Sequence, residues 1–417
     1  MTQRLLDGSP LKRSARIGGV LLLCVAAIVG LFYFTRSSRE MWMNSVSLDA
    51  LKTEGSNNPN DAELNFTLAH RMVMEGRSEE AYAVMQRLVQ QHPDNVQYLI
   101  GLARCSTELM HPVETVNVYN KVLSLDPRQG DVYMSLGQIY GEAGLLTDAL
   151  EKFEKGSQVA PNAEANNVVW IRCLVAKGRY QEAWDRATAI LEKSPKIEDL
   201  YEFTYTAGVP LGKSSELENT LLKRLNMFGS YHGSAAKSAL ARLMIAEQKD
   251  EKTLVTAEML AAESAKGQGA RADDFAALGE VRLLRNDLKG ARSALEDGLK
   301  TDANDPACLK ALAEVAKRQG QKAEAERLQV RLRERIEGGP EVSAQRNAVR
   351  AAPKDAATHL ALAGALEKAG DFGAAAEECH EALRLAPKDS AATARLDECR
   401  LKALEKLAKE SAAKYVR

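Results

Sequence analysis

Apolar and polar residues alternate with a helical period along most of the chain, and residues 131–144 show this most clearly. In a helix, Tyr133, Leu136, Gly137 and Tyr140 would share one face, because residues three, four and seven apart are neighbours on a helix surface. A glycine within this apolar stripe indicates close packing against a second helix. Alternating runs of β-branched and aromatic residues, which would predict strands, are scarce. The pattern therefore predicts an all-α protein.

The helical pattern repeats with a period of 34 residues. Prolines mark this period at Pro93, Pro127, Pro161 and Pro195. Within one period, Gly144 supplies a turn that favours positive φ, and Gly137 and Ala149 let the two helices approach each other. Phe153 fills the space between them, and Pro161 ends the second helix. A single helical hairpin cannot bury its apolar face, so successive hairpins are expected to stack.

This spacing resembles the tetratricopeptide repeat, whose signature is W-x2-L-G-x2-Y, then A-x3-F, then P. Tyr133 stands where that family often has Trp. The resemblance implies an all-α, right-handed superhelical solenoid of antiparallel helix pairs. We expect four repeats over 62–197, two degenerate helical repeats over 198–271, two repeats over 272–339, an extra helix over 340–355, a repeat over 356–389 and a capping helix over 390–417. The extra helix breaks the register, so a kink or a sub-array boundary is expected there.

The N-terminal region instead carries an uncharged apolar run over residues 17–34. A helix of this length spans roughly 27 Å, about one hydrocarbon thickness. A cleaved signal peptide would need a shorter apolar core and a small-residue cleavage site, and in a lipoprotein the run would not continue past Cys24. We therefore expect a transmembrane signal anchor at 17–34, a short cytoplasmic tail at 1–16 and a juxtamembrane linker at 35–61, with room for a short helix over 45–52.

Basic residues flank the apolar run unequally. Four precede it and two follow it closely: Arg4, Lys12, Arg13 and Arg16, then Arg36 and Arg39. This bias favours a cytoplasmic N-terminus. The prediction is a single-pass protein of a bacterial inner membrane, with the repeats on the periplasmic side.

Composition and motifs exclude several classes of function. The formal net charge of −1 argues against a nucleic-acid-binding protein. There is no phosphate-binding loop, dinucleotide motif or zinc-protease motif, and the cysteines form no C-x-x-C pair. Cys105 and Cys173 occupy the tenth place of their repeats, where a small buried residue is usual. The pairs Cys379–His380 and Glu398–Cys399 lack standard metal-ligand spacing. We expect no enzyme activity, no cofactor and no metal.

The resemblance also implies that the second, fifth, ninth, twelfth and thirteenth places of each repeat face a concave groove. The fifth and ninth places of the first four repeats hold Phe66, His70, Ile100, Arg104, Met134, Gln138, Val168 and Arg172. The fifth places form an apolar stripe flanked by Arg104 and Arg172, which suits a peptide that carries acidic groups. The alternatives are that these side chains complete the core between repeats, or that an N-terminal segment fills the groove.

Some relatives bind the acidic C-terminus of chaperones through a Lys/Asn/Arg clamp. Here Phe66 and His70 stand where Lys and Asn are expected, and Asp131 stands where a basic residue is expected. A receptor for chaperone tails is therefore not expected.

These features together predict a membrane-anchored scaffold or assembly factor that binds partner peptides in the groove. Its partners would be other membrane or envelope proteins, and the array has room to form a homo-oligomer. The alternative is an anchored receptor for protein targeting or import that faces the cytosol. An enzyme that uses the repeats as a substrate arm is disfavoured, because nearly every residue after 61 belongs to the array.

Overall fold

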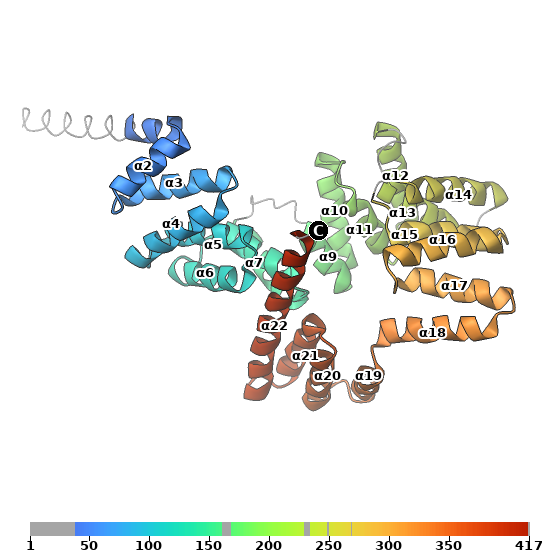
Figure 1. Ribbon diagram of the computed structural model, residues 1–417. Helices are drawn as coiled ribbons and strands as arrows, with labels where there is room; N and C mark the ends of the chain where they lie inside the picture. The colour runs from blue at the N-terminus through green and yellow to red at the C-terminus, as the bar shows by residue number, and fades with distance from the viewer. Residues whose placement is uncertain (1–37, 161–167, 229–233, 248–249, 268, 416–417) are drawn as a thin grey trace, which may run out of the picture. The chain divides into compact units, whose positions relative to one another are not determined.

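The computed structural model describes residues 38–160, 168–228, 234–247, 250–267 and 269–415. These residues form helices α2 to α22 joined by short turns, and the described part of the chain contains no strand (Figure 1). The predicted anchor at 17–34 lies outside the described residues. Of the helices that are described, none has the length and apolar character needed to cross a bilayer.

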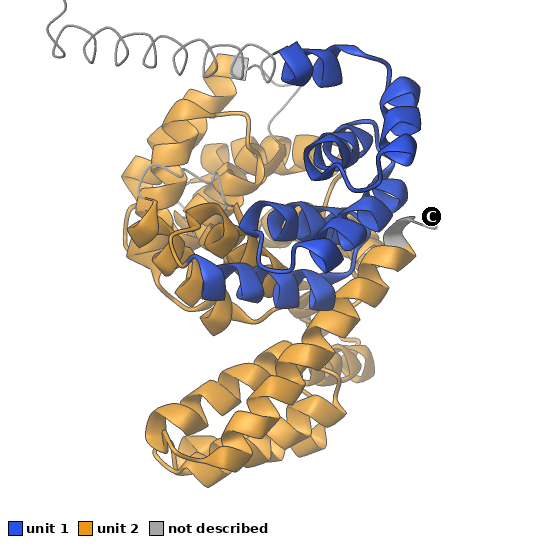
Figure 2. Ribbon diagram, turned by 90° about the vertical axis from the view of Figure 1, so that its left-hand side faces the viewer, with its two compact units in different colours: residues 1–126 blue, residues 127–417 orange. Residues whose placement is uncertain are grey.

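The chain divides into two compact units, residues 1–126 and 127–417 (Figure 2). The first unit contains α2 (Leu48–Asn57), α3 (Ala62–Met74), α4 (Ser78–Gln91), α5 (Val96–Glu108) and α6 (Pro112–Leu125). Helices α3 and α4 form one hairpin and α5 and α6 form the next, and neighbouring helices pack against each other.

The second unit starts with two hairpins of the same kind and ends with a long helix. Its first helices are α7 (Gly130–Glu142), α8 (Leu146–Val159), α9 (Val168–Ala176), α10 (Tyr180–Lys193), α11 (Asp199–Gly208), α12 (Ser214–Phe228), α13 (Ser234–Glu247) and α14 (Glu251–Ala265). They are followed by α15 (Ala272–Leu284), α16 (Leu288–Thr301), α17 (Pro306–Arg318), α18 (Lys322–Glu337), α19 (Pro340–Ala351), α20 (Ala356–Lys368), α21 (Phe372–Leu385) and α22 (Ser390–Tyr415). A single helix, α19, therefore occupies the register break.

The segment at 35–61, expected to be a linker, is a packed part of the first unit from residue 38 onward. Residues 38–45 are helical, and α2 begins three residues later than the expected helix. Met43 and Leu51 are buried in the same core as residues of α3 and α4. Arg71 of α3 donates from Nη1 to the carbonyl oxygens of Met43 and Val46, at 3.1 and 2.6 Å. The sequence was misleading here because residues 53–60, TEGSNNPN, are rich in turn formers, yet residues 53–57 belong to α2.

The turn between the two helices of a pair has the same backbone conformation in repeat after repeat. Its key residue is the fifteenth of the 34-residue repeat, for example Gly144, where φ is +79°. Glycine takes up this left-handed conformation without the steric cost that a Cβ would bring. In two repeats the place is held by other residues, Met110 with φ of 57° and Asn286 with φ of 62°.

Close helix packing in the α7–α8 hairpin depends on Gly137, but its partner differs from the one expected. A Cβ at Gly137 would lie 2.6 Å from Cδ1 of Phe153, so the aromatic ring takes the room that glycine leaves. Ala149 instead lies near Gly141, 3.6 Å from where that Cβ would be. Phe153 also stacks on Trp170 of α9, with ring centroids 5.1 Å apart. One ring thus joins two consecutive repeats.

Candidate functional site

The predicted groove residues of the first unit divide into packed apolar and exposed polar side chains. Phe66 is half-buried and its ring centroid lies 5.3 Å from that of Tyr98. Ile100 is also half-buried, whereas His70 and Arg104 are exposed. The apolar members therefore contribute to contacts between repeats, and the polar members are open to a partner.

The same division holds for the predicted groove residues of the second unit. Met134 is only 7% exposed, and its Cε lies 3.0 Å from the Cβ position of Gly156, so it is a core residue. Val168 is half-buried. Gln138 and Arg172 are exposed; Gln138 donates to Oε1 of Glu142 at 3.1 Å, and Arg172 donates to the carbonyl of Gly141 at 3.3 Å. The role of these residues in binding remains a prediction.

A second candidate surface lies on the first helices of the hairpins between residues 199 and 318. Helices α11, α13, α15 and α17 pack against one another in that order. They carry a set of polar side chains that we call the A-helix charge cluster: Glu202, Tyr205, Arg242, Asp273 and Glu280, which are half-buried, and Lys310, which is exposed.

Arg242 is the central cation of the A-helix charge cluster. Its Nη1 lies 2.6 Å from Oε1 of Glu202, and its guanidinium lies 4.2 Å from the ring centroid of Tyr205. A guanidinium held between a carboxylate and an aromatic face is fixed in position. Arg271 lies farther off, with Nη2 3.9 Å from Oε2 of Glu202.

Asp273 and Glu280 have no such partner. Neither side chain makes a hydrogen bond or an ion pair with another residue in the described part of the chain. Burial raises the pKa of both carboxyl groups, and the charge of Arg242 offsets only part of that rise. An unpaired, partly buried carboxylate is costly, so such groups often mark sites where a ligand supplies the opposite charge.

Asp273 and Glu280 occupy the second and ninth places of the repeat at 272–305. These are places expected to face the groove, so the repeat register was a sufficient signal to find them. The groove residues predicted from the sequence lie only in the first four repeats, where the signature is clearest. Arg242 was harder to find, because the signature fades over 198–271.

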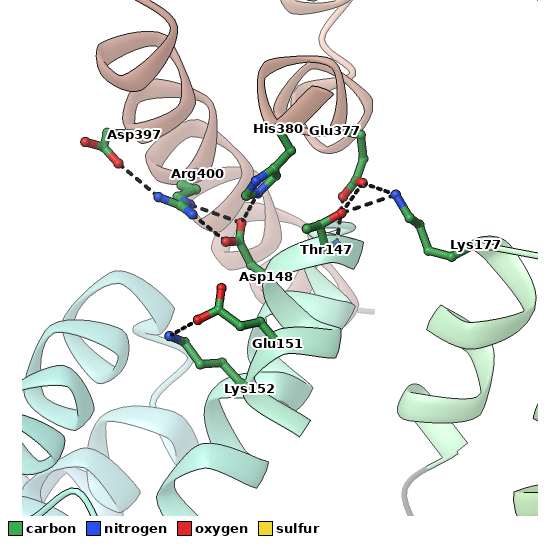
Figure 3. A network of polar contacts seen from close by, with 9 residues as sticks. All are labelled: Thr147, Asp148, Glu151, Lys152, Lys177, Glu377, His380, Asp397 and Arg400. Atoms are coloured by element: carbon green, nitrogen blue, oxygen red, sulfur yellow. Dashed lines mark hydrogen bonds and ion pairs between the residues drawn. The ribbon is translucent and has the colours of Figure 1, made fainter. Parts of the chain in front are cut away.

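A second polar cluster joins segments that are far apart in the sequence, all within the second unit (Figure 3). Its centre is Asp148 of α8, which is only 4% exposed. Arg400 of α22 donates to both carboxylate oxygens of Asp148, from Nε at 3.0 Å and from Nη2 at 2.5 Å. His380 of α21 places Nε2 3.3 Å from Oδ2 of Asp148. Burial would raise the pKa of Asp148, but Arg400 and His380 outweigh it and hold the pKa at about 2.

Glu377 of α21 completes this cluster at the N-terminus of α8. Leu145 precedes α8 and cannot cap it with a side chain. Glu377 accepts from the backbone N–H of Thr147 at 2.9 Å and from its hydroxyl at 2.6 Å, and so provides the acceptor that the helix lacks. Lys177 donates to Glu377 at 2.7 Å. We call these six residues the α8 clasp: Thr147, Asp148, Lys177, Glu377, His380 and Arg400.

The cysteines that the structure describes are all buried and free. Burial raises the pKa of Cys105 and of Cys173 to about 11, which makes both poor nucleophiles. No group of His, Cys, Asp and Glu side chains within the described residues has the arrangement of a metal site.

Comparison with known proteins gives one family match. The tetratricopeptide repeat family matches residues 343–390. No curated protein matches the sequence.

Several solved structures resemble the chain at low identity. The APC/C hetero-tetramer Cut9–Hcn1 is 12% identical, with 87% of this chain and 94% of that chain covered and a TM-score of 0.38. A tetratricopeptide repeat protein from Parabacteroides merdae is 15% identical, with 64% and 90% covered and a TM-score of 0.36. The human IFIT1 dimer with m7Gppp-AAAA is 12% identical, with 78% and 90% covered and a TM-score of 0.42.

The family match falls on α19 to α22, where the helix pair α20 and α21 repeats the arrangement of α7 and α8. The turn glycines of both pairs, Gly370 and Gly144, have positive φ. Residues 343–390 therefore match a tetratricopeptide repeat, and a helix pair of the same arrangement recurs at α7 and α8.

Proposed function

We propose that this protein is a scaffold that binds segments of partner proteins on the first helices of its repeats, and that the partner segment carries cationic side chains. The observation that carries this proposal is the pair of unpaired, half-buried carboxylates Asp273 and Glu280. A lysine or arginine of a partner would compensate their charge where water is partly excluded. Arg242, held by Glu202, would contact an acidic or carbonyl group of the same segment.

The proposal also includes the membrane anchor at 17–34 and a periplasmic location of the repeats. An anchor confines the scaffold and its membrane partners to one bilayer and so raises their effective concentration. Fusion of alkaline phosphatase to the C-terminus tests this topology, because that enzyme is active only outside the cytoplasm. An inactive fusion would favour the receptor that faces the cytosol.

Site-specific photo-crosslinking in cells tests the binding surface. Leu284 lies four residues after Glu280 on the same helix and is 38% exposed, so a photoreactive residue there would reach a bound segment. Val330 of α18 is 49% exposed and serves as the control position. We expect an adduct from position 284 that disappears in the double variant Asp273→Asn, Glu280→Gln.

The matched control for charge is Glu326→Gln with Glu334→Gln, two exposed acids of α18. The same adduct should persist in this variant. Equal adducts at positions 284 and 330, or an adduct that persists without Asp273 and Glu280, would refute the proposed surface.

A further inference from the structure

The last four helices, α19 to α22, form what we call the C-terminal arm, residues 340–415. Few buried side chains join this arm to the preceding helices. The buried side chains of α18 are Ala325 and Leu328, both in its first half, and α19 buries only Val342. Between the two helices stands Gly338, with φ of 82°, and a Cβ there would lie 2.8 Å from Val342. A link with so few buried side chains can bend at low cost in free energy.

At its other end the C-terminal arm is held by the α8 clasp (Figure 3). The polar contacts that join α8 to the arm include hydrogen bonds and ion pairs between Asp148 and Arg400 and between Thr147 and Glu377. Charge-assisted hydrogen bonds of this kind are strong when water is excluded, and water solvates the charged groups once the contact opens. An apolar interface would not have this property.

The backbones also meet beside the α8 clasp. A Cβ at Gly373 of α21 would lie 2.7 Å from the carbonyl oxygen of Gly144, so no side chain fits between the two turns. Next to this contact is a cleft of about 510 Å³, lined from one side by Gly144 and Leu146 and from the other by Phe372 and Lys406.

We propose that the C-terminal arm is a hinged latch, which closes on α8 through the α8 clasp and opens by bending near Gly338. In the closed state Glu377 caps α8 and Arg400 neutralises the buried Asp148. In the open state the N-terminus of α8 and the walls of the cleft become accessible. The latch thus gives the array two states between which a partner selects.

Hydrogen–deuterium exchange of the full chain in detergent tests the latch. One variant, Arg400→Gln with Glu377→Gln, removes the charges of the α8 clasp from the arm. A second, Gly373→Ala, inserts a methyl group against the backbone of Gly144. Gly364→Ala is the control, since its Cβ would meet only the flexible end of Arg395, at 3.3 Å.

We expect both test variants to exchange roughly tenfold faster over residues 145–150 and 372–380, with α15 and α16 unchanged. Gly364→Ala should have no such effect. The latch is wrong if the test variants exchange like the unmodified chain. It is equally wrong if exchange accelerates throughout the second unit, because the α8 clasp would then be part of one continuous core.

Discussion

Two hairpins of the second unit solve the same packing problem in different ways. In α7–α8, the ring of Phe153 fits against Gly137 and stacks on Trp170. In α13–α14 the contact surfaces are mostly alanine, and these helices share an apolar core with α15 to which a buried polar contact is added. Ser264 donates to Oδ1 of Asp274 at 2.7 Å, and both residues are buried. Where the large ring is missing, buried hydrogen bonds provide the specific contact.

The difference teaches that loss of the repeat signature does not mean loss of the repeat. Asp274 also accepts from the backbone N–H of Arg271 at 2.8 Å, so one carboxylate both caps α15 and holds α14. A polar link of this kind specifies a single register, because any shift would leave a buried group without its partner.

The largest effect is expected for Phe153→Ala. The side chain is fully buried between two repeats, so its removal leaves a cavity that rigid helices cannot close. We expect the free energy of unfolding of the second unit to fall by about 3–5 kcal/mol, measured by urea denaturation. Leu222→Ala, at a residue that is 38% exposed, is the control and should change stability little. A small loss for Phe153→Ala would mean that the stacked ring is not what joins the repeats.

Asp274→Ala tests the buried polar contact and should cost about 1–3 kcal/mol, because it leaves the Arg271 amide without its acceptor and leaves the Ser264 hydroxyl only the carbonyl of Ser234, at 2.8 Å. The neighbouring Asp273→Ala is a matched control. Asp273 has no partner among the described residues, and burial raises its pKa, so its removal should be neutral or stabilising. Comparable losses for the two variants would contradict the assigned contacts.

In the α7–α8 hairpin, Asp148 differs from Gly137 and Phe153 because its partners lie far away in the sequence, on α21 and α22. The folded state lowers its pKa from 3.8 to about 2, so its contribution is complete above pH 3.8 and is lost as the pH falls toward 2. The difference in unfolding free energy between the unmodified chain and Asp148→Asn should be constant near neutral pH, and should shrink by about 2 kcal/mol between pH 5 and pH 2. A difference that does not vary with pH in acid would contradict this.

The smallest effect concerns the turn at Met110. Its positive φ strains a residue with a Cβ, so Met110→Gly should raise the unfolding free energy of the first unit by about 0.5–1 kcal/mol. Asn286→Gly should gain less, because asparagine tolerates this conformation better. Thermal unfolding followed by circular dichroism measures both changes. Destabilisation by Met110→Gly would show that contacts of the methionine side chain outweigh the strain.

The sequence predicted the local features of the fold better than its long-range contacts. The spacing of Gly137, Gly144 and Phe153 predicts a hairpin because all three act within one repeat. Asp148 and Arg400 are separated by 252 residues, and no periodic pattern links them. The linker prediction failed for a related reason, since α2 is stabilised by packing on α3 rather than by its own composition.

The groove prediction shows the same limit. Repeat register located the places of Phe66, Ile100 and Met134, but register alone does not tell a groove residue from a core residue. Burial decides this, and it depends on the neighbouring repeat, as the contact of Met134 with α8 shows. Asp273 and Glu280 stand out only when their burial and their missing partners are known.

The most direct test of the account is a binding titration of the full chain with a short, fluorescently labelled Lys-rich peptide. We expect saturable binding that weakens with salt, and a dissociation constant roughly tenfold higher for Asp273→Asn, Glu280→Gln. The control variant, Glu326→Gln with Glu334→Gln, should bind like the unmodified protein. Equal affinity for all three proteins, or no binding at low salt, would contradict the claim that the A-helix charge cluster binds cationic segments.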